Sequence, residues 1–112
     1  MRDVRGYLWD ISKAAQAISF FVDGIDSVTY AETALIHSAV ERKFEIIGEA
    51  LNLLSKIDPE IMERIPESKK IISFRNVLIH GYAVVEHDRV WKVIKQSLPE
   101  LATVVTLLLS EN

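Results

Sequence analysis

The stretch TALIHSAVERKFEIIGEALNLLSK, residues 33–56, decides the fold of this 112-residue chain. Its mostly apolar stripe returns every three or four positions, which is the spacing of one face of an α-helix. The stripe consists of Thr33, Ile36, Val40, Phe44, Ile47, Leu51 and Leu54. The spacing predicts a long helix over about residues 28–56, whose apolar face must be covered by other parts of the chain.

The remaining sequence continues the helical spacing on both sides of this segment. A first helix is expected over about residues 2–22, ended by Gly24, because glycine readily adopts the left-handed conformation that closes a helix. Asp26, Ser27 or Thr29 can then cap the next helix. After it, Asp58 and Pro59 predict a short helical turn. Pro66 separates that turn from a third helix over about residues 67–80, which Gly81 ends.

The last apolar stripe contains a proline. It comprises Val90, Ile94, Ser97, Leu101, Val104 and Leu108. Pro99 lies within it, and proline removes a backbone donor, so the last helix is expected to bend near residues 96–97 or to split into two, with Ser97 as the second cap.

These patterns predict an all-α fold, an antiparallel bundle of four main helices plus a short helical turn, in one domain over residues 1–112. Residues 83–85 come nearest to a strand, but the run is short and does not alternate apolar with polar side chains. Some stripes are wide, and residues 107–109 are three leucines. This surplus of apolar surface predicts a homodimer.

The composition narrows the class of protein. Hydrophobic residues make up 49% of the chain, the net charge is −3 and cysteine is absent. A packed core is therefore feasible, whereas a disulfide scaffold or a thiolate zinc site is excluded. No signal peptide or membrane-spanning run is expected, and a cytoplasmic location fits the lack of cysteine. The negative charge argues against a broad nucleic-acid coat but is compatible with a nuclease that has a local cleft.

The segment RNVLIHGY, residues 75–82, carries the strongest chemical pattern. Arginine holds phosphate through two parallel hydrogen bonds, and histidine can take and give a proton near neutral pH. Arg75 and His80 are five residues apart, about 140° around an ideal helix, so they cannot share one face. Two solutions exist, and we expect both together: the helix ends just before Gly81, so that His80 swings away from its ideal position, and the motifs of two subunits face each other across a two-fold axis. Asn76 could bond a ribose, and Tyr82 could present its hydroxyl beside the arginine and histidine.

The residues of this motif also have ordinary structural interpretations. Arg75 could pair with Glu45 or Glu49, and His80 could simply cap the helix end. Arg42, Glu45 and Glu49 form one ridge on an otherwise apolar helix, so they must face solvent, pair with one another or line a cleft. In a cleft, either glutamate could orient Arg75 or His80. His37 and His87 are expected to be surface or half-buried structural residues. Since the histidines are scattered and no phosphate loop is present, no metal and no cofactor are assigned.

Several blocks of the chain resemble one known family. Arg75-x4-His80-x-Tyr82 is similar to the motif of HEPN-domain toxins of the HepT type. The resemblance extends to four further segments, YLWDI at 7–11, AVERKFEIIGEA at 39–50, VW at 90–91 and LPEL at 98–101. One departure is that the family often has Pro-Trp shortly before the third helix, where this chain has Pro66 followed by Glu67.

The resemblance implies a metal-independent endoribonuclease that is the toxin of a type VII toxin–antitoxin system. Its RNA would be cleaved by attack of a ribose 2′-hydroxyl, with Arg75 and His80 as catalytic residues and Asn76 and Tyr82 as positioning residues. The implied partners are a second copy of the chain and an MNT-type nucleotidyltransferase antitoxin, which would transfer AMP to Tyr82. Two alternatives are a non-catalytic HEPN module that only binds such a nucleotidyltransferase, and a structural helical protein whose motif merely caps a helix.

Overall fold

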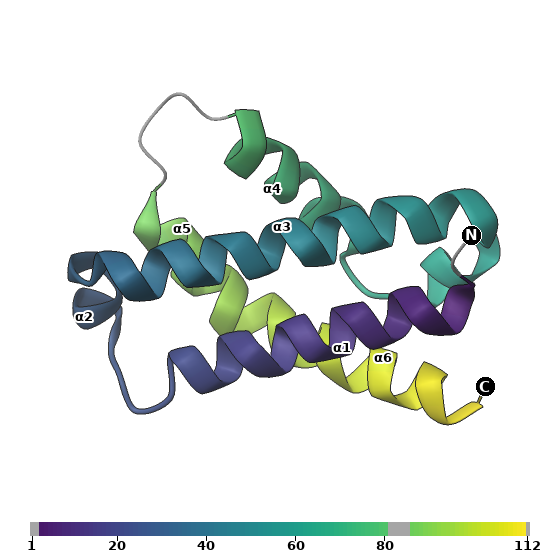
Figure 1. The fold of residues 1–112 in the computed structure, drawn as a ribbon, viewed down its shortest axis with the longest axis horizontal. Helices are drawn as coiled ribbons and strands as arrows, with labels where there is room; N and C mark the ends of the chain where they lie inside the picture. The colour runs from purple at the N-terminus through teal and green to yellow at the C-terminus, as the bar shows by residue number, and fades with distance from the viewer. Residues whose placement is uncertain (1–2, 81–85, 112) are drawn as a thin grey trace.

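The computed structural model describes residues 3–80 and 86–111, and every regular element in them is helical (Figure 1). The six α-helices and two short helices of other types are α1 (Val4–Phe21), α2 (Ser27–Glu32), α3 (Ala34–Ile57), η1 (Pro59–Arg64), α4 (Ser68–His80), α5 (His87–Lys92), η2 (Val93–Ser97) and α6 (Leu98–Glu111). The all-α prediction is confirmed for these residues, while the strand candidate at 83–85 and the helix-ending Gly81 lie outside them.

The two longest helices, α1 and α3, lie side by side and run in opposite directions (Figure 1). Asp3 begins α1, because its side chain accepts a hydrogen bond from the backbone N–H of Gly6 at 2.9 Å. Gly24 follows the end of α1 with φ of +76°, as the sequence predicts. Helix α4 packs against α3, and α6 packs against α1.

One predicted helix is in fact two. The expected helix over residues 28–56 is interrupted at Thr33, which has extended backbone angles and closes α2 while opening α3. The Thr33 hydroxyl donates to the carbonyl of Thr29 at 2.7 Å. Threonine is branched at Cβ and bonds locally to the backbone, so it disfavours a helix interior. The break lets Tyr30 on α2 become completely buried.

The segment between α3 and α4 follows the prediction closely. The Asp58 side chain caps η1 by accepting from the N–H of Ile61, and Pro59 occupies the first position of that short helix. Before α4 the chain turns at Glu67, which has φ of +58°. A non-glycine residue rarely adopts such an angle. The Glu67 carbonyl accepts a hydrogen bond from the N–H of Ile71 at 3.0 Å, which ties the turn to the first turn of α4.

Pro99 does not split the last helix into two helices with a new cap. A π-helical turn, η2, precedes α6, and the N–H of Leu98 bonds the carbonyl of Val93, five residues back. The wider turn shifts the hydrogen-bond register just before Pro99, which has no N–H to donate. The segment from α5 to α6 therefore continues as one helical run, and the predicted cap at Ser97 is wrong.

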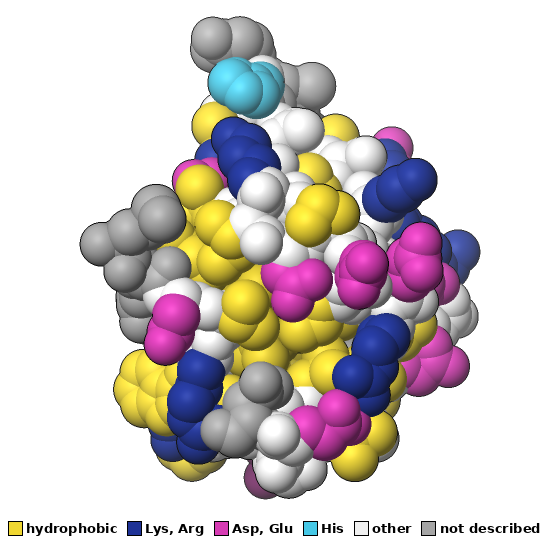
Figure 2. Space-filling view, turned by 90° about the vertical axis from the view of Figure 1, so that its right-hand side faces the viewer, with side chains coloured by type: hydrophobic (Ala, Val, Ile, Leu, Met, Phe, Trp, Pro, Cys, Tyr) yellow, Lys and Arg dark blue, Asp and Glu magenta, His cyan; other side chains and the backbone are white. Residues whose placement is uncertain are grey.

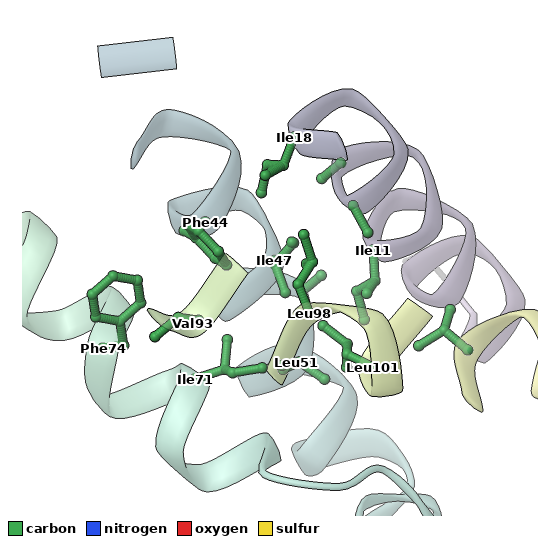
Figure 3. Close-up of a cluster of buried hydrophobic side chains, with 14 of the residues drawn as sticks. Ile11, Ile18, Phe44, Ile47, Leu51, Ile71, Phe74, Val93, Leu98 and Leu101 are labelled. Carbon is green, nitrogen blue, oxygen red and sulfur yellow. The ribbon is translucent and has the colours of Figure 1, made fainter. Parts of the chain in front are cut away.

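The core lies between α1, α3, α4 and the η2–α6 segment (Figure 3). The fully buried side chains at its centre include Ile11, Ile18, Phe44, Ile47, Leu51 and Leu101. Phe44 of α3 meets Phe74 of α4 edge to face, with ring centroids 5.3 Å apart. This contact fixes how α4 lies on α3 and therefore where Arg75, the next residue, is placed.

The run His87–Glu111 is long and apolar enough to cross a membrane by length and composition, contrary to the sequence expectation that no run approaches this length. Core helices of globular proteins pass the same test. In this fold Val90, Ile94, Leu101, Val105 and Leu108 of the run are buried in the core. Packing, including that of α6 against α1, accounts for part of this signal, since 39% of the apolar window is buried in this fold.

Candidate functional site

Helices α1, α3 and α4 enclose an open hollow of about 330 Å³. Its lining is Tyr7, Asp10, Arg42, Glu45, Ile46, Glu49, Ala50, Leu53, Arg75 and Ile79. The charged ridge of α3 thus lines a cleft, which was one of the three arrangements that its sequence allowed. Six of the seven predicted site residues belong to α3 and α4. Four of these six line the hollow: Arg42, Glu45, Glu49 and Arg75.

Gly48 allows α3 and α4 to approach closely at Arg75. A Cβ atom on Gly48 would lie 2.2 Å from Arg75 Cβ and 2.6 Å from Arg75 Cγ, distances that real side chains do not adopt. The arginine stem therefore crosses α3 directly over the glycine. This contact carries the guanidinium to the neighbouring Glu49 and into the hollow.

Two acceptors fix the Arg75 guanidinium. Its Nη2 donates to Glu49 Oε2 in a short ion pair, and its Nη1 donates to Asn76 Oδ1 at 2.9 Å. The side chain is only 21% exposed, and its buried Nε has no hydrogen-bond partner. A half-buried arginine held from two sides keeps a defined orientation, and an anion entering the hollow would meet a cation that is already placed.

The other two members of the α3 ridge, Arg42 and Glu45, are not held by an ion pair as Arg75 is. Among the described residues no ion pair joins Arg42 to Glu45, so the intrahelical pair suggested by the sequence is not formed. Both side chains line the hollow, with Arg42 exposed and Glu45 half-buried. Of the two glutamates proposed as partners of Arg75, the structure selects Glu49.

His80 is the last residue of α4, exposed, and absent from the lining of the hollow. The described part of α4 ends just before Gly81, where the sequence predicts the helix end. His80 is four residues after Asn76 and three after Val77, and all three side chains are exposed on one side of α4. Arg75 and His80 consequently face different directions within one chain. Tyr82 lies outside the described residues.

The surface agrees with a local site. Figure 2 shows one end of the molecule, where basic and acidic side chains alternate among apolar ones with no continuous basic area. This matches the net charge of −3. Binding of a polyanion would therefore depend on a few placed cations such as Arg75 and Arg42.

A second polar group was missed by the sequence analysis. His37 and His87 are half-buried, as expected, but they are not scattered in space: their ring centroids are 4.1 Å apart. Tyr30 packs against both rings, and burial raises the pKa of its hydroxyl well above 10.0. The available signal was the i, i+4 spacing of His37 and Glu41, but nothing local indicated that α5 returns to this place.

Comparison with known proteins supports the resemblance seen in the motifs. The family model for HepT-like ribonucleases, "Ribonuclease HepT-like", matches residues 11–108. A Methanocaldococcus jannaschii protein named "Putative RNase" is 33% identical, over 89% of this chain and 91% of that relative. A Caldanaerobacter subterraneus protein with the same description is 32% identical over 100% of this chain and 99% of its own. A Thermococcus cleftensis protein named "Probable ribonuclease HepT" is 33% identical over 89% of this chain and 90% of its own. No solved structure matches. Because the family model covers residues 11–108, nearly the whole chain, the chain belongs to the HepT-like ribonuclease family.

Proposed function

We propose that this chain is an endoribonuclease that cleaves RNA without a metal ion and serves as the toxin of a type VII toxin–antitoxin system. The observation that carries the proposal is Arg75, held by Glu49 and Asn76 at the edge of an open hollow. Membership of the HepT-like family and the names of the relatives support the substrate class.

The chemistry requires a placed cation and a proton carrier. The ribose 2′-oxygen attacks the adjacent phosphorus, the bond to the 5′-oxygen breaks, and the products are a 2′,3′-cyclic phosphate and a 5′-hydroxyl. Arg75 binds the phosphate oxygens and stabilises the charge that builds on them. His80 takes the 2′-hydroxyl proton or gives one to the leaving 5′-oxygen, a role usually worth about 10²–10⁴-fold in rate. Asn76, Glu45 and Arg42 position the RNA.

The active unit in this proposal is a homodimer. One chain directs Arg75 and His80 about 140° apart on a continuous helix, so a complete site takes the arginine of one copy and the histidine of the other. Val77 and Ile79 support this arrangement, because they are 46% and 42% exposed on α4, next to His80. Exposed apolar side chains beside a polar motif are typical of an isologous interface.

The antitoxin in this proposal is an MNT-type nucleotidyltransferase that transfers AMP to Tyr82 in the cytoplasm. Tyr82 is two residues after His80, so the added group would place bulk and negative charge where the substrate phosphate binds. Inhibition would then need no long-range change in the protein. Intact-mass measurement and peptide mapping after co-expression with the neighbouring gene should show an AMP-sized increment, or a multiple, on Tyr82. An unmodified chain bound to that partner would contradict this part of the proposal.

Cleavage of a labelled RNA by the tag-free protein in the presence of a chelator tests the activity. Wild-type protein should leave 2′,3′-cyclic phosphate ends, and Arg75→Ala and His80→Ala should not cleave although they remain folded by circular dichroism. Arg64→Ala is the matched control, since Arg64 is exposed and pairs with Glu111 away from the hollow. Loss of cleavage in Arg64→Ala, or full cleavage by both motif variants, would contradict the assignment. An inactive wild-type dimer would instead favour the non-catalytic binding module.

Mixing two inactive variants tests the composite site. If Arg75 and His80 act across the two-fold axis, a dimer of one Arg75→Ala chain and one His80→Ala chain keeps one intact site. Random exchange of subunits should then restore about a quarter of wild-type activity, because half the dimers are mixed and each has one of two sites. If both residues act within one chain, the mixture stays inactive.

A further inference from the structure

A cluster of two histidines and a glutamate lies where α2, α3 and α5 meet, outside the lining of the Arg75 hollow. His37 and Glu41 are one turn apart on α3, and His87 is the first residue of α5. One ligand atom from each side chain lies within 4.8 Å of the other two. The His37 Nδ1 and Glu41 Oε2 atoms are 3.5 Å apart, too far for a good hydrogen bond.

Three buried polar atoms in this cluster have no hydrogen-bond partner. They are Nδ1 of His37, Nδ1 of His87 and the hydroxyl of Tyr30, whose side chain is completely buried. The Tyr30 ring lies 6.2 Å from the His37 ring and 6.1 Å from the His87 ring, centroid to centroid. Buried polar groups are nearly always paired, so three such atoms together without partners indicate that a ligand would satisfy them.

The donor types select the ligand. Two imidazoles and one carboxylate are a common ligand set for zinc and related divalent transition metals, with a fourth position open to water. In a tetrahedral zinc site the donor atoms are roughly 3.3 Å apart, given metal–ligand distances of about 2.0–2.2 Å. The present atoms lie up to 4.8 Å apart, so the widest pair must come closer by about 1.5 Å for such a site to form. The His37 and Glu41 side chains are 19% and 22% exposed, which leaves an entry path from solvent.

We propose that His37, Glu41 and His87 bind one divalent transition-metal ion of the zinc type, with the Tyr30 hydroxyl bonded to the bound carboxylate or to the metal-bound water. The ion ties α3 to the start of α5. Helix α5 has only six residues, and its N-cap Glu86 makes no side-chain capping bond, so α5 gains most from such a link. The role is structural and does not rest on RNA cleavage. It replaces the sequence-based assignment of no metal.

Titration of the tag-free, chelator-treated protein with Zn²⁺ tests the site. Calorimetry should show one ion per chain, the thermal midpoint should rise on adding Zn²⁺, and Co²⁺ should give the visible absorption of a low-coordinate site. His37→Gln, His87→Gln and Glu41→Gln should each weaken binding more than about 10-fold, the lower end of what even supporting residues contribute. His80→Gln is the matched control, because it removes an exposed histidine from another helix.

Glutamine keeps much of the side-chain volume, and the metal-free thermal midpoint of each variant shows whether it still folds. A variant that fails to fold is replaced by the corresponding asparagine for the two histidines and by alanine for Glu41. The proposal is overturned if wild-type protein shows no saturable binding of Zn²⁺, in which case the cluster is only a packed aromatic group with Trp91. It is also overturned if His80→Gln loses the affinity while the three cluster variants keep it.

Discussion

The Arg75 hollow and the histidine cluster both involve α3, but they differ in how many of their polar atoms have hydrogen-bond partners. In the hollow, Glu49 and Asn76 bond both terminal nitrogens of Arg75. In the cluster, Tyr30, His37 and His87 each have a buried polar atom without a hydrogen-bond partner. The first arrangement fixes a cation for use on an incoming anion, whereas the second leaves coordination capacity that a ligand from solution can occupy. Half-buried polar residues therefore have different meanings according to whether their partners are already present.

The largest expected effect is on the rate of RNA cleavage, which should fall on substitution in the Arg75 hollow but not in the histidine cluster. Arg75→Ala should lower the single-turnover rate of RNA cleavage by about 10²–10³-fold, since it removes a placed donor from the charged transition state. Arg75→Lys should recover little, because lysine lacks the forked donor. His37→Gln should leave the rate unchanged at a temperature well below its thermal midpoint. Equal losses in Arg75→Ala and His37→Gln would show that the two regions act as one site.

A slightly smaller effect is expected from Gly48→Ala. The added methyl group would collide with the Arg75 stem and force α3 and α4 apart, so the free energy of unfolding should fall by about 1–3 kcal/mol despite alanine's better helix propensity. Cleavage should fall with it, as the guanidinium is displaced from Glu49. Urea denaturation and the cleavage rate measure the two consequences.

The matched control is Gly24→Ala, in a turn where an added Cβ meets nothing within 4 Å but φ is +76°. This change should cost stability through backbone strain alone and leave the cleavage rate intact. If both glycine variants lose cleavage to the same degree, the close approach at Gly48 does not position Arg75.

Sequence reasoning predicted the helices better than it predicted the second cluster. Helical spacing placed Phe44 and Ile47 in the core, and a pair between Arg75 and Glu45 or Glu49 was one of the arrangements that the sequence allowed. These inferences succeed because they depend on local periodicity or on one helix packing against the next. The break at Thr33 was missed because one threonine within a long apolar stripe has only a weak local preference.

The π-helical turn and the histidine cluster depend on features that the spacing of apolar residues along the sequence does not show. A stripe of period 3.6 cannot show that η2 widens by one residue before Pro99. Likewise, His37 and His87 are fifty positions apart, and only the return of α5 against α2 and α3 brings them together. The interrupted helix matters here as well, because α2 carries the Tyr30 ring that packs against both histidine rings.

Removing the Tyr30 hydroxyl should raise the free energy of unfolding of the metal-free protein by about 1 kcal/mol. In metal-free protein, Tyr30→Phe should raise the free energy of unfolding, because it removes a buried polar group that lacks a partner while keeping the ring contacts. Urea denaturation in a chelator measures this change, and Tyr7→Phe, at a half-buried tyrosine of the hollow, is the control. A loss of stability in Tyr30→Phe would mean that the hydroxyl is already paired.

The same residue predicts a loss of stability at alkaline pH. Burial, with a smaller contribution from Glu41, raises the pKa of Tyr30 above its ordinary 10.0. The unfolded chain then releases the Tyr30 proton near pH 10, while the folded chain keeps it. The contribution of the protonated hydroxyl to the free energy of unfolding is therefore complete below pH 10 and is lost as the pH rises further. Thermal midpoints between pH 9 and pH 11 should fall less in Tyr30→Phe than in wild type. Parallel decreases in the two proteins would show that Tyr30 ionises freely.

The smallest expected effect concerns the cap of α2, the helix that carries Tyr30 to the histidine cluster. Asp26 accepts a hydrogen bond from the N–H of Thr29 at 2.8 Å, and this bond lowers the pKa of its carboxyl below 3.8. The ionised Asp26 cap therefore contributes to the free energy of unfolding above pH 3.8, and this contribution is lost as the pH falls through the lower folded-state pKa. Asp26→Asn keeps an acceptor at every pH, so its thermal midpoint should decline less than that of wild type below pH 4. The control is Asp23→Asn, at an exposed position beyond α1, which should follow wild type.

The cap of α2 can also be tested through metal binding. If the cap helps to place Tyr30, Asp26→Ala should weaken Zn²⁺ binding slightly at neutral pH and Asp26→Asn should not. Unchanged affinity in Asp26→Ala would show that packing of Tyr30, and not its cap, sets the geometry of the cluster.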